Sequence, residues 1–486
     1  MLALAVISCL ASGYVIVALG WPRSLSASSD LLLRLSLSVG FGLGTFSVIF
    51  FLSRVLGVGH LIAIDASILT LLVTTFFLRG GQDHARDTST YSVEGVQLPR
   101  WLHRVVTASF VIALCAALYS AVLRAIAHPH GEGWDAFAIW NLHARFLFRG
   151  GEHWRDGFSA LIPWSHPDYP LLLPSAVAHF WSILRHEDTA VPAGIGLAFT
   201  LSTVALLFSS LDKLRGRISA LLGSLALLST PFFIEQGSSQ YADVPLAFFF
   251  LASMALVHLY DRCSNMSARR PRGLLVLSGL AAGFAAWTKN EGMLFLFASL
   301  AAQVLIFVGR WNPRPAPNEA SVRTARDNAE DRPILAGFLI AAAPFLLLIA
   351  WFKHSIAFSS ELFSNQTMLR DKILDPARYS AILKWFGKDL LRFGDWWLIP
   401  GTLLLLAFYF AIARKRSPRP KPAIHASVWT LALTLAGYFA IYVITPYDLY
   451  WHLRFSLNRL FLQLWPCAIF LFFLALPLRA HKNVSN

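Results

Sequence analysis

The sequence predicts an all-α, polytopic membrane protein, and both its composition and the spacing of its apolar residues support that prediction. Of its 486 residues, 56% are hydrophobic and only 14% are charged, and the mean hydropathy is +0.56. Soluble proteins of this length contain far fewer apolar residues. The apolar residues also gather in runs of roughly 20, the length at which a helix crosses the hydrocarbon core of a bilayer.

About thirteen such runs are long enough to span a membrane. They lie at 2–20, 31–53, 59–79, 104–125, 191–211, 217–234, 243–260, 273–288, 292–309, 334–352, 396–413, 426–444 and 460–478. The first run has no basic residues before it, which favours a membrane helix over a cleaved signal peptide.

The charged residues indicate on which side of the membrane each loop lies. Lys and Arg outnumber Asp and Glu by 41 to 27, a net charge of +14 that on its own suggests a nucleic-acid partner. The basic residues are instead confined to short loops between apolar runs, where the positive-inside rule accounts for them. The sequence therefore predicts a multi-pass protein of the inner (plasma) membrane, in contact with membrane lipids and not with nucleic acid.

The remaining loops fall together on the opposite, extracytoplasmic side. They are the two large loops 126–190 and 353–395, the shorter segments 235–242 and 445–459, and a tight turn at 289–291. Every polar group that suggests chemistry lies in or beside one of them, so we expect an active site on the outer face. We further expect an N-terminal transmembrane extension with a cytoplasmic linker at 1–103, a catalytic core at 104–478 and a cytoplasmic tail at 479–486.

The segment 133–149, which reads GWDAFAIWNLHARFLFR, contains the first candidate catalytic residue. Its aromatic and aliphatic residues recur at helical spacing, which predicts an interfacial helix with its apolar side on the membrane. Asp135, near its start, is a candidate general base or metal ligand for a hydroxyl or amine acceptor. The alternative is that Asp135 only caps the helix, since Asp is a favoured N-cap residue.

Two short motifs at the ends of apolar runs supply further charged candidates. Asp243 opens a run in the sequence QYADVP, where the helix dipole favours an anion, and it is the second candidate catalytic residue, which would orient the acceptor, a metal ion or Lys289. The alternative is a purely structural role, which is common for a carboxylate at a helix start. In TKNEG, Lys289 and Glu291 stand between two apolar runs, where charges are costly unless they face a polar cavity. Lys289 is a candidate phosphate ligand supported by Glu291, or it only snorkels to the interface.

A basic, aromatic-rich segment precedes the last apolar run. His452, Arg454 and Arg459 lie there among Tyr and Trp residues, and charge-assisted hydrogen bonds would let these three hold a phosphate or pyrophosphate. An ordinary aromatic belt at the membrane surface is the alternative. Arg459 stands at the start of a predicted span and is therefore harder to explain as a solvated charge.

Histidines and cysteines raise the question of a metal site. His166 and Asp168 belong to HPDYPLLLP, a stiff entry to a second interfacial helix, and are candidate supporting residues. No pair of loop histidines shows a recognised ligand spacing, so the binding of a divalent metal ion stays open. The cysteines show no paired spacing either, which indicates neither a disulfide framework nor a zinc motif. They are Cys9, Cys115, Cys263 and Cys467.

Taken in order, these motifs resemble those of a known family. An acid in a large first external loop, then PLLLP, YADVPLAFF, TKNEG and a basic C-terminal segment resemble the GT-C glycosyltransferases that use polyprenyl-phosphate sugars. The bacterial aminoarabinose–lipid A transferases, the RgtA/B/C/D-like enzymes and the protein O-mannosyltransferases are similar over roughly residues 104–478. The order, spacing and common sidedness of the motifs carry the resemblance more than any single motif does.

The resemblance implies a role for each matching residue. Asp135 takes the place of the catalytic acid of the first loop, although Ala136 follows it where relatives often have a second acid. Asp243 matches the Asp of the short second external loop. Lys289 matches the Lys of a TKGP-type turn, with Asn-Glu-Gly in place of Gly-Pro, and the HPDYP sequence at 166–170 corresponds loosely to a KPPL segment.

The resemblance thus implies an inverting membrane glycosyltransferase of the cell envelope, with a polyprenyl-phosphate-linked sugar as donor. Its acceptor would be a lipid, glycan or protein group on the extracytoplasmic face. Two other classes remain as alternatives. A transporter or flippase of lipid-linked sugars tends to place polar groups near the bilayer midplane and to contain inverted repeats, and no repeat is visible here. A non-catalytic membrane assembly protein would tolerate the loss of Asp135.

Overall fold

In the computed structural model every regular element is a helix, over the part of the chain that it describes. That part comprises residues 1–22, 30–80, 98–264, 271–311, 320–357, 369–395, 401–412 and 422–476. In chain order the helices are α1 (Leu2–Gly20), α2 (Leu31–Val55), α3 (Leu61–Gly80), α4 (Arg100–Ala127), the π-helix η1 (Ala136–Trp140), α5 (Asn141–Arg149), the 3-10 helices η2 (Gly151–Phe158) and η3 (Pro163–Ser165), α6 (Leu172–Leu184), α7 (Ala190–Arg215), α8 (Arg217–Leu228), α9 (Pro231–Ser238), α10 (Asp243–Ser264), α11 (Arg272–Thr288), α12 (Asn290–Trp311), α13 (Ala320–Ser355), α15 (Leu369–Leu374), α16 (Pro376–Arg392), α17 (Gly401–Ile412), α18 (Pro422–Ile444) and α19 (Leu449–Ala475).

Nine helices in the described residues are long and apolar enough to cross a membrane, which makes the chain a multi-pass membrane protein. They are α1, α2, α3, α4, α7, α10, the Leu335–Ser355 part of α13, α18 and α19. The pair α8 and α9 makes a tenth if it is counted as one span bent by 68°. Twelve of the thirteen predicted runs coincide with one helix each, and the run at 217–234 falls on α8 and α9. Helix α11 is shorter than a full span, and so is the apolar Asn290–Leu305 stretch of α12, so the count of about thirteen stays a prediction.

The bend between α8 and α9 has a local cause in the sequence. Pro231 begins α9, and Thr230 before it is extended, with φ −99° and ψ 99°. A residue that precedes proline is pushed out of the helical region, so the run predicted at 217–234 cannot continue as one straight helix.

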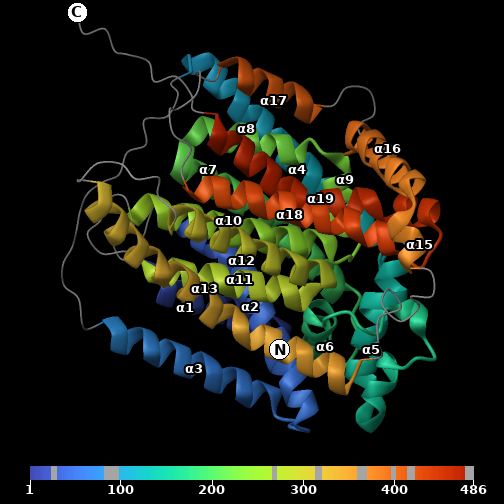
Figure 1. Ribbon diagram of the computed structural model, residues 1–486. Helices are drawn as coiled ribbons and strands as arrows, with labels where there is room; N and C mark the ends of the chain where they lie inside the picture. The colour runs from blue at the N-terminus through green and yellow to red at the C-terminus, as the bar shows by residue number, and fades with distance from the viewer. Residues whose placement is uncertain are drawn as a thin grey trace, which may run out of the picture.

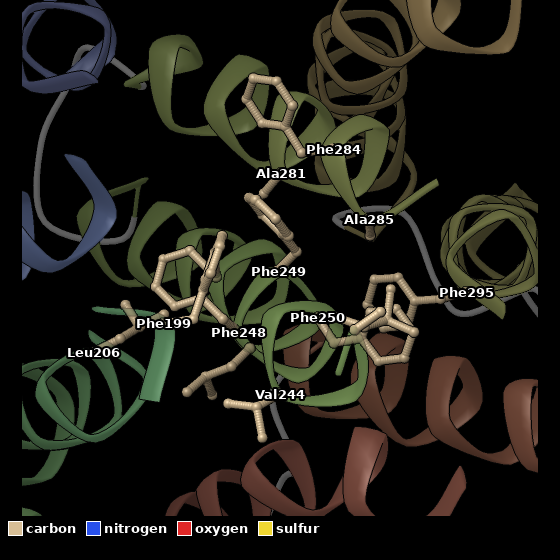
Figure 2. Close-up of a cluster of buried hydrophobic side chains, with 14 of the residues drawn as sticks. Phe199, Leu206, Val244, Phe248, Phe249, Phe250, Ala281, Phe284, Ala285 and Phe295 are labelled. Carbon is tan, nitrogen blue, oxygen red and sulfur yellow. The ribbon is translucent and has the colours of Figure 1, made fainter. Parts of the chain in front are cut away.

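Helix α10 is the centre of the bundle. In its apolar stretch 94% of the residues are buried, whereas in α3, at the edge of the bundle in Figure 1, only 6% are. Phenylalanines on α10 contact rings from three other helices, as Figure 2 shows. Phe249 lies 5.6 Å from Phe199 of α7 and 5.6 Å from Phe284 of α11, and Phe250 stacks on Phe295 of α12 at 3.9 Å. The start of α10 is thereby held rigidly among its neighbours.

Several boundaries differ from the predicted ones. Helix α19 begins at Leu449 rather than near 460, because Asp448 caps it by accepting a hydrogen bond of 2.8 Å from the Trp451 amide. Much of the predicted external segment 445–459 is therefore helical. Helix α13 begins at Ala320, well before the predicted span at 334. Most of the linker at the end of 1–103 and the whole tail 479–486 lie outside the described residues.

The predicted interfacial helix at 133–149 is present in two pieces, η1 and α5. Its apolar side packs against α6 inside the protein, where Trp140 and Leu147 are buried. Trp134 and Phe137 stay exposed and contact each other at 5.4 Å. Helix α6, the second predicted interfacial helix, is itself almost wholly buried. Helices α1 and α2 pack closely on the rest of the bundle, so the packing marks no boundary near residue 103. The division of the chain there stays a prediction.

Glycines bring α1 and α2 into backbone contact. A Cβ atom on Gly13 would lie 2.0 Å from the Ser38 carbonyl oxygen, and one on Gly42 would lie 2.3 Å from the Cys9 carbonyl oxygen. Small residues of this kind let membrane helices approach closely and gain van der Waals contact along their length.

We therefore expect Gly42→Ala to separate α1 from α2 and to destabilise the protein by about 1–3 kcal/mol, the usual cost of overpacking. The thermal unfolding midpoint of the purified protein in detergent measures this loss. Gly194→Ala in α7 is the matched control, since no atom lies within 4 Å of the added Cβ. Equal midpoints for the two variants would contradict the packing described here.

Candidate active site

Five charged side chains from distant parts of the sequence meet at one end of the bundle. Asp135 lies just before η1, Asp243 begins α10, and Arg459 lies in α19. Lys289 and Glu291 come from the junction of α11 and α12. We call these five residues the charged cluster. The sequence predicted that the segments carrying them would share one side, and the contacts below join them directly.

Arg459 connects the two aspartates of the charged cluster. Its Nη1 atom lies 2.7 Å from Oδ2 of Asp135, and its Nε atom lies 2.8 Å from Oδ2 of Asp243. The guanidinium also lies 4.7 Å from the centre of the Tyr241 ring, which suits a cation–π contact. With two carboxylates and an aromatic face around it, this guanidinium is held in one orientation.

The Asp243 carboxylate is fully enclosed and fully paired. Its side chain has no exposure, and besides Arg459 it accepts hydrogen bonds from Lys289 Nζ at 3.2 Å and Gln463 Nε2 at 2.6 Å. The Gln463 amide oxygen in turn accepts a bond of 2.6 Å from the Tyr438 hydroxyl. A carboxylate bound in this way is suited to hold cations in place, because its negative charge is already matched by donors.

Lys289 occupies the single-residue break between α11 and α12. Its backbone is extended, with φ −161° and ψ 160°, and a Cβ atom on Gly292 would lie 1.8 Å from the Ala285 carbonyl oxygen. Only glycine therefore permits so tight a turn. The ammonium lies 2.9 Å from Oε1 of Glu291, and the Lys289 side chain is 6% exposed. Burial lowers the pKa of Lys289, but the carboxylates of Asp243 and Glu291 raise it above its ordinary value, so the side chain stays cationic.

Asp135 is the most accessible carboxylate of the charged cluster, with 22% of its side chain exposed. Its side chain makes no N-cap hydrogen bond, so the alternative of a simple helix cap finds no support in the geometry. The phenol of Tyr241 lies nearby. Burial, followed by the charge of Asp135, raises the pKa of Tyr241 to about 12, which keeps this hydroxyl protonated at neutral pH.

A second polar network lies next to the charged cluster. Lys353, at the end of α13, donates to the Asp168 carboxylate at 3.2 Å, to the Asp168 carbonyl at 3.0 Å and to the Asn290 side-chain oxygen at 2.9 Å. Asn290 donates to Asp168 at 2.7 Å. These bonds tie the loop before α6 to the turn that carries Lys289.

Besides Asp168 of the second network, three predicted residues lie outside the charged cluster. His166 adopts a left-handed backbone with φ 51° and stacks on Tyr169 at 4.7 Å. The His452 ring nitrogen Nδ1 lies 2.9 Å from the Thr445 hydroxyl. Arg454 is exposed and lies 5.7 Å from the Phe455 ring, and no contact between described residues joins it to the charged cluster. The structure therefore brings Arg459, but not Arg454, into contact with the aspartates of the charged cluster.

Sequence reasoning missed Gln463, Asn290 and Lys353. Gln463 stands within a predicted apolar span, and its spacing of four residues from Arg459 is the signal that places both on one face of a helix. Lys353 stands at the very end of a span, where a lysine is usually explained by its side chain reaching to the membrane interface. Among the described residues, no group of three or more His, Cys, Asp or Glu side chains is arranged to hold a metal ion.

Arg459 should be the main stabilising cation of this end of the bundle. Arg459→Met leaves the carboxylates of Asp135 and Asp243 without their shared partner, and breaking a buried ion pair costs about 3–5 kcal/mol. We expect a large fall in the thermal unfolding midpoint, partly reversed by adding Asp243→Asn. Arg454→Met removes a similar side chain from an exposed site and should change the midpoint little. Similar losses in both single variants would contradict the bridging role.

The chain is similar to a known family model and to a solved structure. The family model described as dolichyl-phosphate-mannose-protein mannosyltransferase matches residues 168–322. Among solved structures, ArnT from Cupriavidus metallidurans, crystallised with undecaprenyl phosphate, is similar with a TM-score of 0.44 and 17% sequence identity. That match covers 75% of this chain and 59% of ArnT, so the chain spans less than two thirds of the ArnT length. No curated protein matches the sequence. The family match confirms the predicted resemblance to protein O-mannosyltransferases over the segment that carries Asp168, Asp243, Lys289 and Glu291.

Proposed function

We propose that the protein is a membrane glycosyltransferase that moves a sugar from a polyprenyl-phosphate donor to a lipid, glycan or protein acceptor. The observation that carries this proposal is the pairing of an accessible carboxylate, Asp135, with the partly buried cation Arg459, which Asp243 in turn joins to the buried cation Lys289. An acceptor needs a base and a departing phosphate needs positive charge, and both are present within one cluster. The acceptor and the donor would meet on the extracytoplasmic face.

The reaction is a single displacement at the anomeric carbon of the sugar. The acceptor oxygen or nitrogen forms a bond to that carbon as the bond to the phosphate oxygen breaks, and the phosphate leaves with the electron pair. Asp135 takes the proton that the acceptor loses. Because attack and departure occur on opposite faces, the configuration of the anomeric carbon inverts.

The two cations stabilise the negative charge that grows on the departing phosphate. Preorganised charges of this kind are often the largest single contribution to catalysis, since they need no reorientation during the reaction. Arg459 offers planar, bidentate hydrogen bonding to phosphate oxygens, and Lys289 offers a point charge. Asp243 and Glu291 hold these side chains and do not take part in proton transfer. His166, Asp168 and His452 would support the surrounding loops, and Arg454 would meet the donor only outside the charged cluster.

A transporter or flippase of lipid-linked sugars is the competing function. Transporters place their binding groups near the bilayer midplane, on broken helices. Here Asp135, Asp243 and Lys289 all stand at helix boundaries at one end of the bundle, which favours an enzyme. A non-catalytic assembly protein would need none of these charges for its activity.

Asp135→Asn tests the proposed base. The amide keeps the size of the carboxylate but cannot accept the proton, so we expect turnover to fall by about 100- to 10,000-fold. The measurement is sugar transfer from purified polyprenyl-phosphate donor, with expression and thermal midpoint recorded alongside. Asp156→Asn, in the same loop with 68% of its side chain exposed, is the matched control. A variant at 135 with most of its activity intact would remove Asp135 from the mechanism.

Lys289 should bind the donor phosphate. Lys289→Met keeps the apolar stem and removes the ammonium, so phosphate binding predicts weaker donor affinity and slower turnover. Lys289→Arg should restore part of both, because the charge returns with different geometry. Both variants are compared with the wild type in the same nanodisc preparation. Unchanged donor affinity in Lys289→Met would transfer the phosphate-binding role to Arg459 and its neighbours on α19.

A further inference from the structure

Helix α16 lies on the outside of the bundle (Figure 1), and only one of its sides is packed. Ile382 is buried, and Phe386 contacts Phe439 of α18 at 5.7 Å and Phe461 of α19 at 5.5 Å. Asp375 caps the helix by accepting a hydrogen bond of 2.9 Å from the Ala377 amide. The helix is therefore well defined, and the face turned away from the protein needs its own explanation.

Both ends of α16 are fastened to the ends of apolar helices. Near its start, Arg378 donates from Nε to the Val443 carbonyl at 2.8 Å and from Nη2 to the Tyr442 carbonyl at 3.0 Å, in the last turn of α18. Just beyond its end, the Gly394 carbonyl accepts a bond of 3.3 Å from the Phe232 amide in α9. These bonds hold α16 beside the end of α18, a helix long and apolar enough to cross a membrane.

The outward side of α16 carries two parallel stripes. One is apolar, with Leu383, Leu390 and Leu391 exposed by 62%, 64% and 84%. The other is basic, with Lys384, Lys388 and Arg392 at successive spacings of four residues, all exposed. Lys388 lies 4.6 Å from the Trp385 ring. Within the described chain none of these three cations forms an ion pair with a carboxylate.

We propose that α16 is a membrane-surface helix that binds the phosphate groups of anionic lipids. Leucine side chains exposed to this degree are unfavourable in water but favourable against acyl chains. Cations beside them on the same helix then lie at the level of the lipid phosphates, which attract them. The charge of the basic stripe and the apolar character of its neighbour thus select one occupant, an anionic lipid surface. This proposal does not depend on the proposed enzymatic function.

The depth of α16 is tested with a spin label on the full-length protein in nanodiscs. The label is placed by Leu391→Cys in a Cys115→Ser background, because Cys115 is exposed and the other three cysteines are buried. We expect strong collision with oxygen and protection from a water-soluble nickel chelate. A label placed by Asp156→Cys is the aqueous control. Equal chelate access at both positions would overturn the proposal.

The preference for anionic lipid needs a separate measurement. Nanodiscs are formed from mixed phosphatidylglycerol and phosphatidylcholine, and the lipids retained by the protein are quantified. The triple variant Lys384→Gln, Lys388→Gln, Arg392→Gln should lower the retained excess of phosphatidylglycerol about fivefold or more. Lys384→Arg with Lys388→Arg keeps the charge and should keep the excess. An unchanged excess in the triple variant would overturn the proposal. Protection of the label only in native membranes, and not in nanodiscs, would overturn it in favour of a protein partner.

Discussion

The arrangement of the polar end of this bundle depends on the burial of one carboxylate, that of Asp243. A charge without solvent costs several kcal/mol unless donors surround it. Asp243 obtains them from Arg459, Lys289 and Gln463, which come from α19 and from the α11–α12 junction. The phenylalanines of α10 fix the position of the carboxylate, and the carboxylate fixes the two cations. The packing of the core thereby determines where the charged side chains of the site lie.

Arg459 links the buried carboxylate of Asp243 to the accessible carboxylate of Asp135. In the structure its guanidinium binds Asp135 and Asp243 at once. A donor phosphate that approaches Arg459 would compete with Asp135, the more exposed of the two carboxylates, and would leave the pairing with Asp243 in place. Binding of the donor and release of the base would then be one event. This coupling explains why the candidate base is held in an ion pair before the donor binds.

Helix boundaries explain which parts of the site were predictable from the sequence. Asp243 and Lys289 stand where apolar runs begin or end, so composition alone located them. The sequence predicts Arg454 beside Arg459 because it places both in an external segment at 445–459. In helix α19, five residues turn the side chain by about 140°, and Arg454 faces away. Asn290 and Lys353 act through contacts between segments far apart in sequence, which no local pattern reveals. For Gln463 the helical spacing from Arg459 is a local signal, but its bond to Asp243 joins distant segments. Apolar length likewise located the helices but did not separate full spans from shorter helices such as α11.

The central claim, that Arg459 and Lys289 receive a phosphate while Asp135 becomes free, is tested most directly by an experimental structure with polyprenyl phosphate bound. Both cations should contact the phosphate oxygens, and Arg459 should keep its bond to Asp243 and no longer contact Asp135. A phosphate bound elsewhere, with the Arg459–Asp135 pair intact, would contradict the account.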